Sequence, residues 1–306
     1  MKKILLLIFT LASAAAATAQ QELMISQYMF NGLVLNPAYA GSHPYWSASV
    51  LHRSQWVNFE NAPTTQTFCI DGPLFGKKLG VGLTATNDQL GVTRQQEFAL
   101  NAAYRLDLSR GYLSAGLRLA GANYSANLTD VVIWDTDDVV YANNLSNEFA
   151  YKAGFGVYYF ERNWFAGVSV PTLFSSDQNI LPENSDINRF FENHYYINAG
   201  MVYEVNPVMA IKPSFLIKYE NAAPLQVDLN CNILFFEKFW FGAGWRSGDA
   251  MMVMAEWNIT NHLRVGYAYD YTLSTIANYS NGSHEVMLGY DFGSNVKMKA
   301  RSPRYF

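Results

Sequence analysis

Long apolar runs and charged side chains are both scarce in this chain. After residue 19 no apolar run approaches the roughly 18 residues that a transmembrane helix needs, so none is predicted. Only 15% of the 306 residues are charged, whereas about a quarter is usual in a soluble domain. Yet 50% are hydrophobic and 15% are aromatic. So much apolar surface without a long run excludes a helical membrane protein and does not suit a soluble enzyme.

Cysteine and histidine are sparse as well. Cys69 and Cys231 fall on opposite faces of distant predicted strands, so no disulfide is expected. No histidine lies at a metal-ligand spacing from another, and the cysteines have no such neighbours, so neither a metal nor a cofactor is predicted. The histidines are His43, His52, His194, His262 and His284.

The first 19 residues have the pattern of a secretory signal peptide. Lys2 and Lys3 precede an apolar run from Ile4 to Leu11, and the small-residue site Ala17-Thr18-Ala19 follows. Without this peptide the 21 Lys and Arg fall to 19 against 25 acidic residues, a net charge of about −6. Such an acidic chain is not expected to bind nucleic acid, which requires a basic face.

Apolar and polar residues alternate along short segments of the rest of the chain. Residues 96–107 carry apolar side chains at one set of alternate positions and mainly polar ones at the other. The apolar set is Phe98, Leu100, Ala102, Tyr104 and Leu106, and the polar set is Glu97, Asn101, Arg105 and Asp107. Because successive side chains of a strand point to opposite faces, this period predicts strands with one apolar face. In lipid such a sheet must close, since no water satisfies an open edge.

The chain contains fourteen such segments, and they predict an all-β fold. The predicted strands are 45–56, 64–74, 78–87, 94–107, 111–124, 148–160, 163–171, 193–205, 208–219, 223–235, 238–247, 250–258, 262–273 and 283–293. All even-numbered connections are short, and the long ones are all odd-numbered. Because membrane barrels have short periplasmic turns and longer outer loops, we expect residues 45–293 to form a transmembrane antiparallel β-barrel of about 14 strands in the outer membrane, with both termini periplasmic.

Two segments flank the predicted barrel. Residues 20–44 do not alternate and are too apolar to float in water, so we expect a plug-like segment that packs in or under the lumen; a loose periplasmic leader is the alternative. Residues 294–306 form a basic periplasmic tail, which we expect either to bind a partner or to serve barrel assembly. The candidate residues of the tail are Lys297, Lys299, Arg301, Arg304, Tyr305 and Phe306.

The polar side chains do not predict catalysis. Asp130, Asp135, Asp137 and Asp138 lack the glycine and final glutamate of a calcium loop, so a solvated acidic loop is the better interpretation. No motif such as Gly-x-Ser-x-Gly supplies a serine nucleophile that could pair with His262, so we expect His262 to be a turn or interface residue. The inner face carries charges of both signs. They fit a water-filled pore, a network that holds a plug or, as we favour, structural ion pairs.

Several longer motifs are distinctive. They are Gln27-Tyr28-Met29-Phe30-Asn31, Asn36-Pro37-Ala38-Tyr39-Ala40-Gly41-Ser42, Arg53-Ser54-Gln55-Trp56-Val57-Asn58-Phe59, Ala62-Pro63-Thr64-Thr65-Gln66, Ser283-His284-Glu285-Val286-Met287-Leu288-Gly289-Tyr290-Asp291-Phe292 and Ser302-Pro303-Arg304-Tyr305-Phe306. Together they resemble the PorP/SprF family over essentially the whole mature chain. The chain departs from the family's pattern at Gly32, a position where we would expect a larger residue or proline. The motif residues expected at the contact between the N-terminal segment and the barrel are Asn36, Pro37, Tyr39, Gly41, Arg53, Gln55 and Trp56.

The resemblance implies a non-enzymatic outer-membrane component of the type IX secretion and gliding machinery of Bacteroidota. Besides outer-membrane lipid, its partners would be the periplasmic ring lipoproteins and a peptidoglycan-binding protein, or a large secreted adhesin that it helps to export or anchor. The residues leave two other functions open. One is an outer-membrane channel or transporter of hydrophobic solutes, and the other is a membrane hydrolase.

Overall fold

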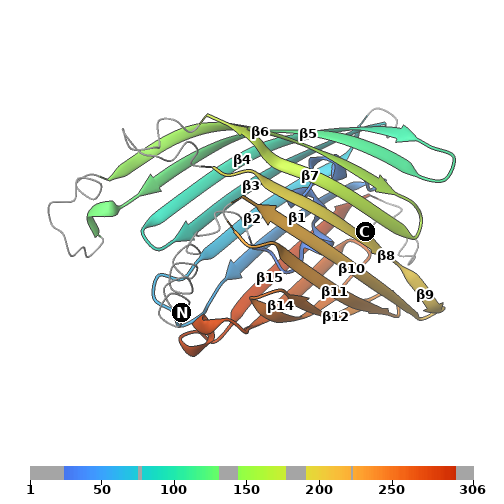
Figure 1. The fold of residues 1–306 in the computed structure, drawn as a ribbon. Helices are drawn as coiled ribbons and strands as arrows, with labels where there is room; N and C mark the ends of the chain where they lie inside the picture. The colour runs from blue at the N-terminus through green and yellow to red at the C-terminus, as the bar shows by residue number, and fades with distance from the viewer. Residues whose placement is uncertain (1–23, 75–77, 131–143, 177–190, 222, 294–306) are drawn as a thin grey trace, which may run out of the picture.

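The computed structural model describes residues 24–74, 78–130, 144–176, 191–221 and 223–293, most of them in strands (Figure 1). The strands are β1 (Trp46–Ser54), β2 (Thr64–Leu74), β3 (Leu79–Leu90), β4 (Thr93–Asp107), β5 (Tyr112–Ala126), β6 (Leu145–Phe160), β7 (Trp164–Ser175), β8 (His194–Met201), β9 (Tyr203–Asn206), β10 (Met209–Glu220), β11 (Gln226–Phe235), β12 (Phe239–Arg246), β13 (Ala250–Asn258), β14 (Leu263–Thr272) and β15 (Ser283–Phe292). Short 3-10 helices are η1 (Tyr28–Phe30), η2 (Gly32–Val34), η3 (Pro37–Tyr39), η5 (Leu128–Asp130) and η7 (Thr275–Asn278). Among the residues described, no helix is long and apolar enough to cross a membrane.

The strands form one closed antiparallel sheet. Each strand except β8 pairs with the next along the chain, and β1 pairs with β15 from Trp46 opposite Phe292 to Ser54 opposite His284. β8 and β9 lie end to end along β10, so the barrel has fourteen strand positions, as predicted. The predicted strand 193–205 is interrupted at Val202, whose N–H donates to the carbonyl of Asn163, just before β7, at 2.7 Å.

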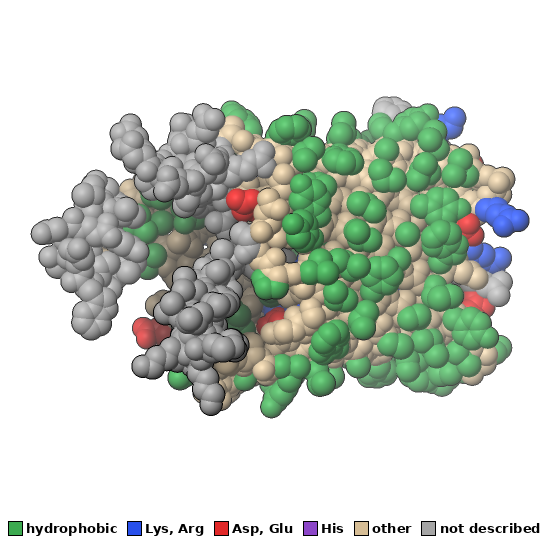
Figure 2. Space-filling model, viewed as in Figure 1, with side chains coloured by type: hydrophobic (Ala, Val, Ile, Leu, Met, Phe, Trp, Pro, Cys, Tyr) green, Lys and Arg blue, Asp and Glu red, His purple; other side chains and the backbone are tan. Residues whose placement is uncertain are grey.

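The two faces of the wall follow the alternation in the sequence. On β4, Leu100 is 64% exposed on the outer face, whereas the next residue, Asn101, is 2% exposed on the inner face. Cys231 is exposed on the outside and Cys69 is buried, both as free thiols, in agreement with their predicted faces. Figure 2 shows hydrophobic side chains over most of the visible outer wall. This distribution matches the apolar outer band of a transmembrane barrel.

The two ends of the barrel differ in their connections. One end, called the loop end below, carries the links β1–β2, β3–β4, β5–β6, β7–β8, β10–β11, β12–β13 and β14–β15. The other, called the turn end, carries only short links such as 108–111, 161–163 and 207–208, together with the start of β1 and the end of β15. All the long connections are therefore at the loop end, as the sequence predicts, although the links 91–92 and 247–249 at that end are as short as turns.

The strands β3 to β6 extend further at the loop end than predicted. The connection expected at residues 88–93 is only Gly91 and Val92, because Asp88 and Gln89 still pair with Gln95 and Arg94 of β4. The alternation fails here because both faces are polar. Polar side chains on both faces indicate that this part of the sheet projects beyond the apolar band into water. In Figure 1 the ends of β5 and β6 reach furthest at the loop end.

Candidate functional site

Residues 24–44, called the N-terminal segment below, lie among the inward-facing side chains of the barrel. They form the single turns η1, η2 and η3 and no strand. The buried members include Ile25, Ser26, Gln27, Tyr28, Met29, Leu33, Asn36, Ala38 and Tyr39. Their hydrogen bonds reach β1, β2, β6, β7, β10, β11, β14 and β15. The segment therefore contacts the wall on all sides of the lumen.

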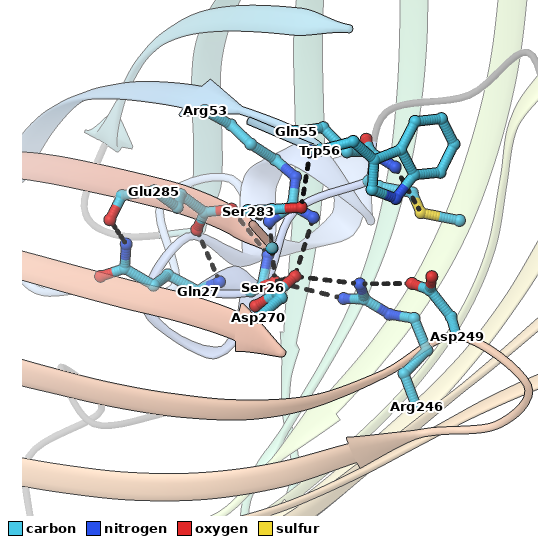
Figure 3. Close-up of polar contacts among 12 residues, drawn as sticks. Ser26, Gln27, Arg53, Gln55, Trp56, Arg246, Asp249, Asp270, Ser283 and Glu285 are labelled. Atoms are coloured by element: carbon cyan, nitrogen blue, oxygen red, sulfur yellow. Dashed lines mark hydrogen bonds and ion pairs between the residues drawn. The ribbon is translucent and has the colours of Figure 1, made fainter. Parts of the chain in front are cut away.

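An ion cluster holds the start of this segment near the loop end (Figure 3). Arg53 Nη2 lies 2.8 Å from Asp270 Oδ2, and Arg53 Nη1 lies 3.3 Å from Glu285 Oε2. Arg246 contacts three carboxylates of the cluster at 3.2 to 3.3 Å, those of Asp228, Asp249 and Asp270. Buried charges are tolerated only when they are paired and hydrogen-bonded. In this cluster Arg53 and Arg246 each lie beside more than one carboxylate, so the buried charges are paired.

Ser26 and Gln27 complete the hydrogen bonding of the ion cluster. The carboxylate of Glu285 accepts the N–H groups of Ser26 and Gln27, both at 2.8 Å. Ser26 Oγ donates to Asp270 Oδ2 at 2.7 Å and accepts from Arg53 Nη1 at 3.0 Å. The backbone of the segment and the strands β1, β14 and β15 thus share one network.

The middle of the segment is fixed by bonds to the part of the wall that β7, β10 and β11 form. Lys212, fully buried on β10, donates its Nζ to the carbonyl of Met29 at 2.9 Å. On β11, Asn230 Nδ2 donates to the Tyr28 hydroxyl at 2.6 Å. On β7, Ser169 Oγ donates to the carbonyl of Leu35 at 2.6 Å. The carbonyls of Met29 and Leu35 thus accept hydrogen bonds from side chains of the lumen. Buried backbone groups need such partners when no helix or sheet supplies them.

Asn36 connects the segment to β6 and β7. Its Oδ1 caps η3 by accepting the N–H of Ala38 at 2.9 Å, and Pro37 occupies the first position of that turn. Its Nδ2 donates to the carbonyls of Val157 at 3.0 Å and Val168 at 3.4 Å. The wall admits this approach because it carries glycine there, since a Cβ on Gly156 of β6 would lie 2.1 Å from Asn36 Oδ1. On the neighbouring β5, a Cβ on Gly116 would lie 2.3 Å from the Ala38 nitrogen.

The end of the segment turns at Gly41, close to the turn end. Gly41 has φ +65°, a conformation that favours glycine, and its N–H donates to Asp71 Oδ2 at 2.8 Å. The Tyr39 hydroxyl lies 3.0 Å from His43 Nε2. The ring of Tyr39 covers Gly32, where a Cβ would be 2.6 Å from a ring carbon. The small residue at 32 thus makes room for Tyr39.

Apolar side chains fill the lumen toward the turn end. Phe30 meets Trp240 edge-on at 5.9 Å between ring centroids, and Tyr39 meets Tyr158 at 5.5 Å. One buried cluster joins these residues of the segment and wall, among them Leu33, Ala38, Tyr39, Tyr158, Phe160, Phe165, Leu234 and Trp240. A cross-section packed in this way leaves little room for water.

A second charged group lies on the inner face of β4, β5 and β6, beside the segment. Glu97 accepts from Arg118 and, at 2.7 Å, from Lys152 Nζ. The Lys152 Nζ also lies 4.0 Å from the ring centroid of Phe191, a cation–π distance. A small cavity open toward the loop end is lined by these charged residues and by Val34 and Leu35 of the segment.

The candidate residues from the sequence fall into four groups. Asn36, Pro37, Tyr39 and Gly41 lie inside the barrel with the partners given above. Arg53 and Gln55 contact the start of the segment, Gln55 through Met24 with 3.9 Å between Nε2 and Sδ. The Trp56 N–H instead bonds to Ser283 Oγ at 3.1 Å, and the tail candidates lie outside the described residues.

Other residues of the site lie outside the sequence motifs quoted above. They are Ser26, Gly116, Ser169, Lys212, Asn230 and Asp270 in the roles described. Five of the six lie on strands that are distant in sequence from the segment, so only the closed barrel brings them to it. Their inward parity and small or polar nature was the available signal.

The described residues also include the histidine and one of the acidic residues that were considered above for chemistry. No group of three or more His, Cys, Asp or Glu residues there is placed to hold a metal ion. His262 bonds through Nδ1 to the carbonyl of Asp291 at 2.9 Å and stacks on Tyr290. Asp135, Asp137 and Asp138 lie outside the described residues.

Solved outer-membrane barrels are similar in fold to this chain but distant in sequence. The outer membrane protein Omp33 of Acinetobacter baumannii has 10% identity and a TM-score of 0.46, over 81% of this chain and 99% of that one. The KdgM porin has 9% identity and a TM-score of 0.39 over the same shares. A mutant of the Rh. blastica porin has 10% identity and a TM-score of 0.34, again over 81% and 99%.

No curated protein has a significant sequence match to this chain. The model of one protein family does match it, over residues 17–290, and that family is described as type IX secretion system membrane protein PorP/SprF. The match spans the N-terminal segment and nearly the whole barrel, including the motifs from Gln27 to Ser42 and from Ser283 to Tyr290. The chain therefore belongs to the PorP/SprF family of type IX secretion system membrane proteins.

Proposed function

We propose that this protein is a non-enzymatic outer-membrane component of the type IX secretion and gliding machinery that acts by binding another protein. The N-terminal segment serves as a plug in this proposal. The supporting observation is that residues 24–44 occupy the lumen and are bonded to strands on all its sides. A barrel closed in this way is suited to holding a partner rather than to passing solutes.

The charges of the lumen support the same function. An open pore would present its charged side chains to water, whereas Arg53, Arg246, Asp270 and Glu285 are buried and bonded to each other or to the segment. Toward the turn end the contact of Phe30 with Trp240 is apolar. In this proposal the ion pairs and the apolar contacts hold the N-terminal segment in the lumen.

The turn end is the proposed contact surface for the partner. In this proposal it faces the periplasm, because membrane barrels have their short turns on that side. It carries the exposed basic residues Arg110, Arg162 and Lys238, and the basic tail 294–306 follows β15 there. The partner is a periplasmic ring lipoprotein or peptidoglycan-binding protein, or the secreted adhesin that the barrel exports or anchors.

Deletion of residues 297–306 tests the role of the tail. We expect the shortened barrel to reach the outer membrane in normal amount but to lose its partners in affinity purification followed by mass spectrometry. Secretion or adhesin display would fail with it. Deletion of the loop residues 57–61, at the other end, is the control and should leave the partners bound. Loss of the barrel itself from the outer membrane would instead identify the tail as an assembly signal.

Conductance of the purified protein distinguishes the plugged barrel from the alternative function, a channel or transporter of hydrophobic solutes. We expect no steady conductance in planar bilayers from the intact chain. Removing residues 24–40 should open a pore if the barrel still forms. A steady, open conductance of the intact chain would contradict the plug.

A further inference from the structure

The direction in which the N-terminal segment runs through the lumen can be read from its contacts. β1 begins at Trp46 at the turn end, next to the end of β15. The residues just before it are at the same end. Gly41 bonds to Asp71, and its Cα is in close contact with Gly80, two residues that flank the β2–β3 turn.

The first residues of the segment lie at the opposite end. Met24 contacts Gln55, which directly follows the last residue of β1 and leads into the loop between β1 and β2. Ser26 and Gln27 bond to Glu285, the third residue of β15, and Ser26 also bonds to Asp270, the third-last residue of β14. The loop between β14 and β15 joins these two strands, so both contacts are at the loop end.

The contacts between these two ends lie on the inner wall. Met29 bonds to Lys212, the fourth residue of β10, and Leu35 bonds to Ser169, the sixth residue of β7, and both strands begin at the turn end. From the sequence, both termini are expected on the periplasmic side, where the short turns are expected. The amino terminus itself lies outside the described residues, and the first described residue, Met24, lies at the loop end.

We infer that the N-terminal segment threads the whole barrel, with Met24 at the loop end and Gly41 at the turn end. If the loops face the exterior, as proposed above, the part of the plug beside Gln55 lies on the outer side of the barrel. A protein or ligand that approaches from outside then meets this end of the plug first.

The ion cluster provides the anchor for this arrangement. Arg53 and Glu285 are paired residues across the junction of β1 and β15, where the barrel closes. Glu285 also binds the backbone of Ser26 and Gln27. The chain is thus held at the loop end by the same carboxylate that lies at the junction of the first and last strands.

Cysteine cross-linking tests the direction of threading without reference to the membrane side. In a background with Cys69 and Cys231 changed to alanine, we expect M24C with Q55C to cross-link under mild oxidation. M24C with S109C, at the turn end, should not. The heat-dependent shift of the barrel on gels verifies folding of each variant. Cross-linking only to S109C, or in neither folded variant, would overturn the inference.

An epitope tag inserted after Gln21 tests on which face the chain emerges. We expect an antibody to detect it on intact cells, as it would a tag inserted at Gly248 in the loop 247–249. A matched tag at Arg162, in the turn 161–163, should be detected only after permeabilisation. An N-terminal tag that behaves like the tag at Arg162 would overturn the inference. Because neither experiment measures conductance or partners, a failure here is distinct from a failure of the proposed function.

Discussion

Arg53 of β1 and Asp270 of β14 form a buried ion pair, 2.8 Å from Nη2 to Oδ2, although β15 lies between their strands. The Glu285 side chain of β15 points to the same place and bonds to Arg53 at 3.3 Å. Three strands and the backbone of Ser26 therefore meet in one network at the closing junction of the barrel. Because of this network, we expect the stability of the barrel to depend on the N-terminal segment in its lumen.

We expect R53M to destabilise the barrel strongly. The substitution leaves Asp270 and Glu285 as buried carboxylates with fewer partners, and breaking a buried pair from one side costs about 3–5 kcal/mol. The measurement is the free energy of unfolding in urea with lipid vesicles. H52M, the neighbouring exposed position on the outer face, is the control and should change stability little. Equal effects of both changes would show that the network contributes nothing.

Enlarging Gly116 should displace the N-terminal segment. A side chain there meets the backbone of Ala38, 2.3 Å from its nitrogen, which cannot move aside without the segment. We expect G116L to insert as a barrel but to show open conductance and rapid proteolysis of residues 24–44. A115L places the same side chain on the exposed outer face and should behave like the native chain. A closed, protease-resistant G116L barrel would disprove this coupling.

A charged side chain on the outer wall should destabilise the barrel more near the middle of the apolar band than at its edge. Leu100, in the middle of β4, is 64% exposed on the lipid face. We expect L100R to lower the free energy of unfolding by about 2–4 kcal/mol, as arginine does near the bilayer midplane. L108R makes the same change in the turn after β4 and should cost about 0–1 kcal/mol. Similar losses at both positions would argue against a membrane boundary between them.

The barrel could be predicted because its signal is local. Alternation along residues 96–107 places each side chain on a face without knowledge of any partner strand, and the exposure of Leu100 and Asn101 confirms it. The strand ends were less predictable. Residues such as Asp88 still pair with β4, but polar side chains on both faces remove the alternation that marks a strand.

The sequence predicted which kinds of side chain would lie inside the barrel but not which residues would bond to each other. Motifs identified Asn36 and Gly41, whose roles in a cap and at positive φ are local properties of the chain. The partners of Met29 and Tyr28 lie on β10 and β11, about 180 to 200 residues away, and no local pattern links them. The path of the segment from the loop end was missed for the same reason.

Labelling of single cysteines on intact cells tests the orientation of the barrel. Glu60 lies exposed in the loop 55–63, and Ser109 lies exposed in the turn 108–111. In a background with Cys69 and Cys231 changed to alanine, we expect a membrane-impermeant maleimide to label E60C and not S109C. Permeabilised cells should show both labelled, which controls for access to each thiol. Because long loops are expected outside and short turns in the periplasm, the reverse labelling would invert the membrane side of every element, including the proposed contact surface.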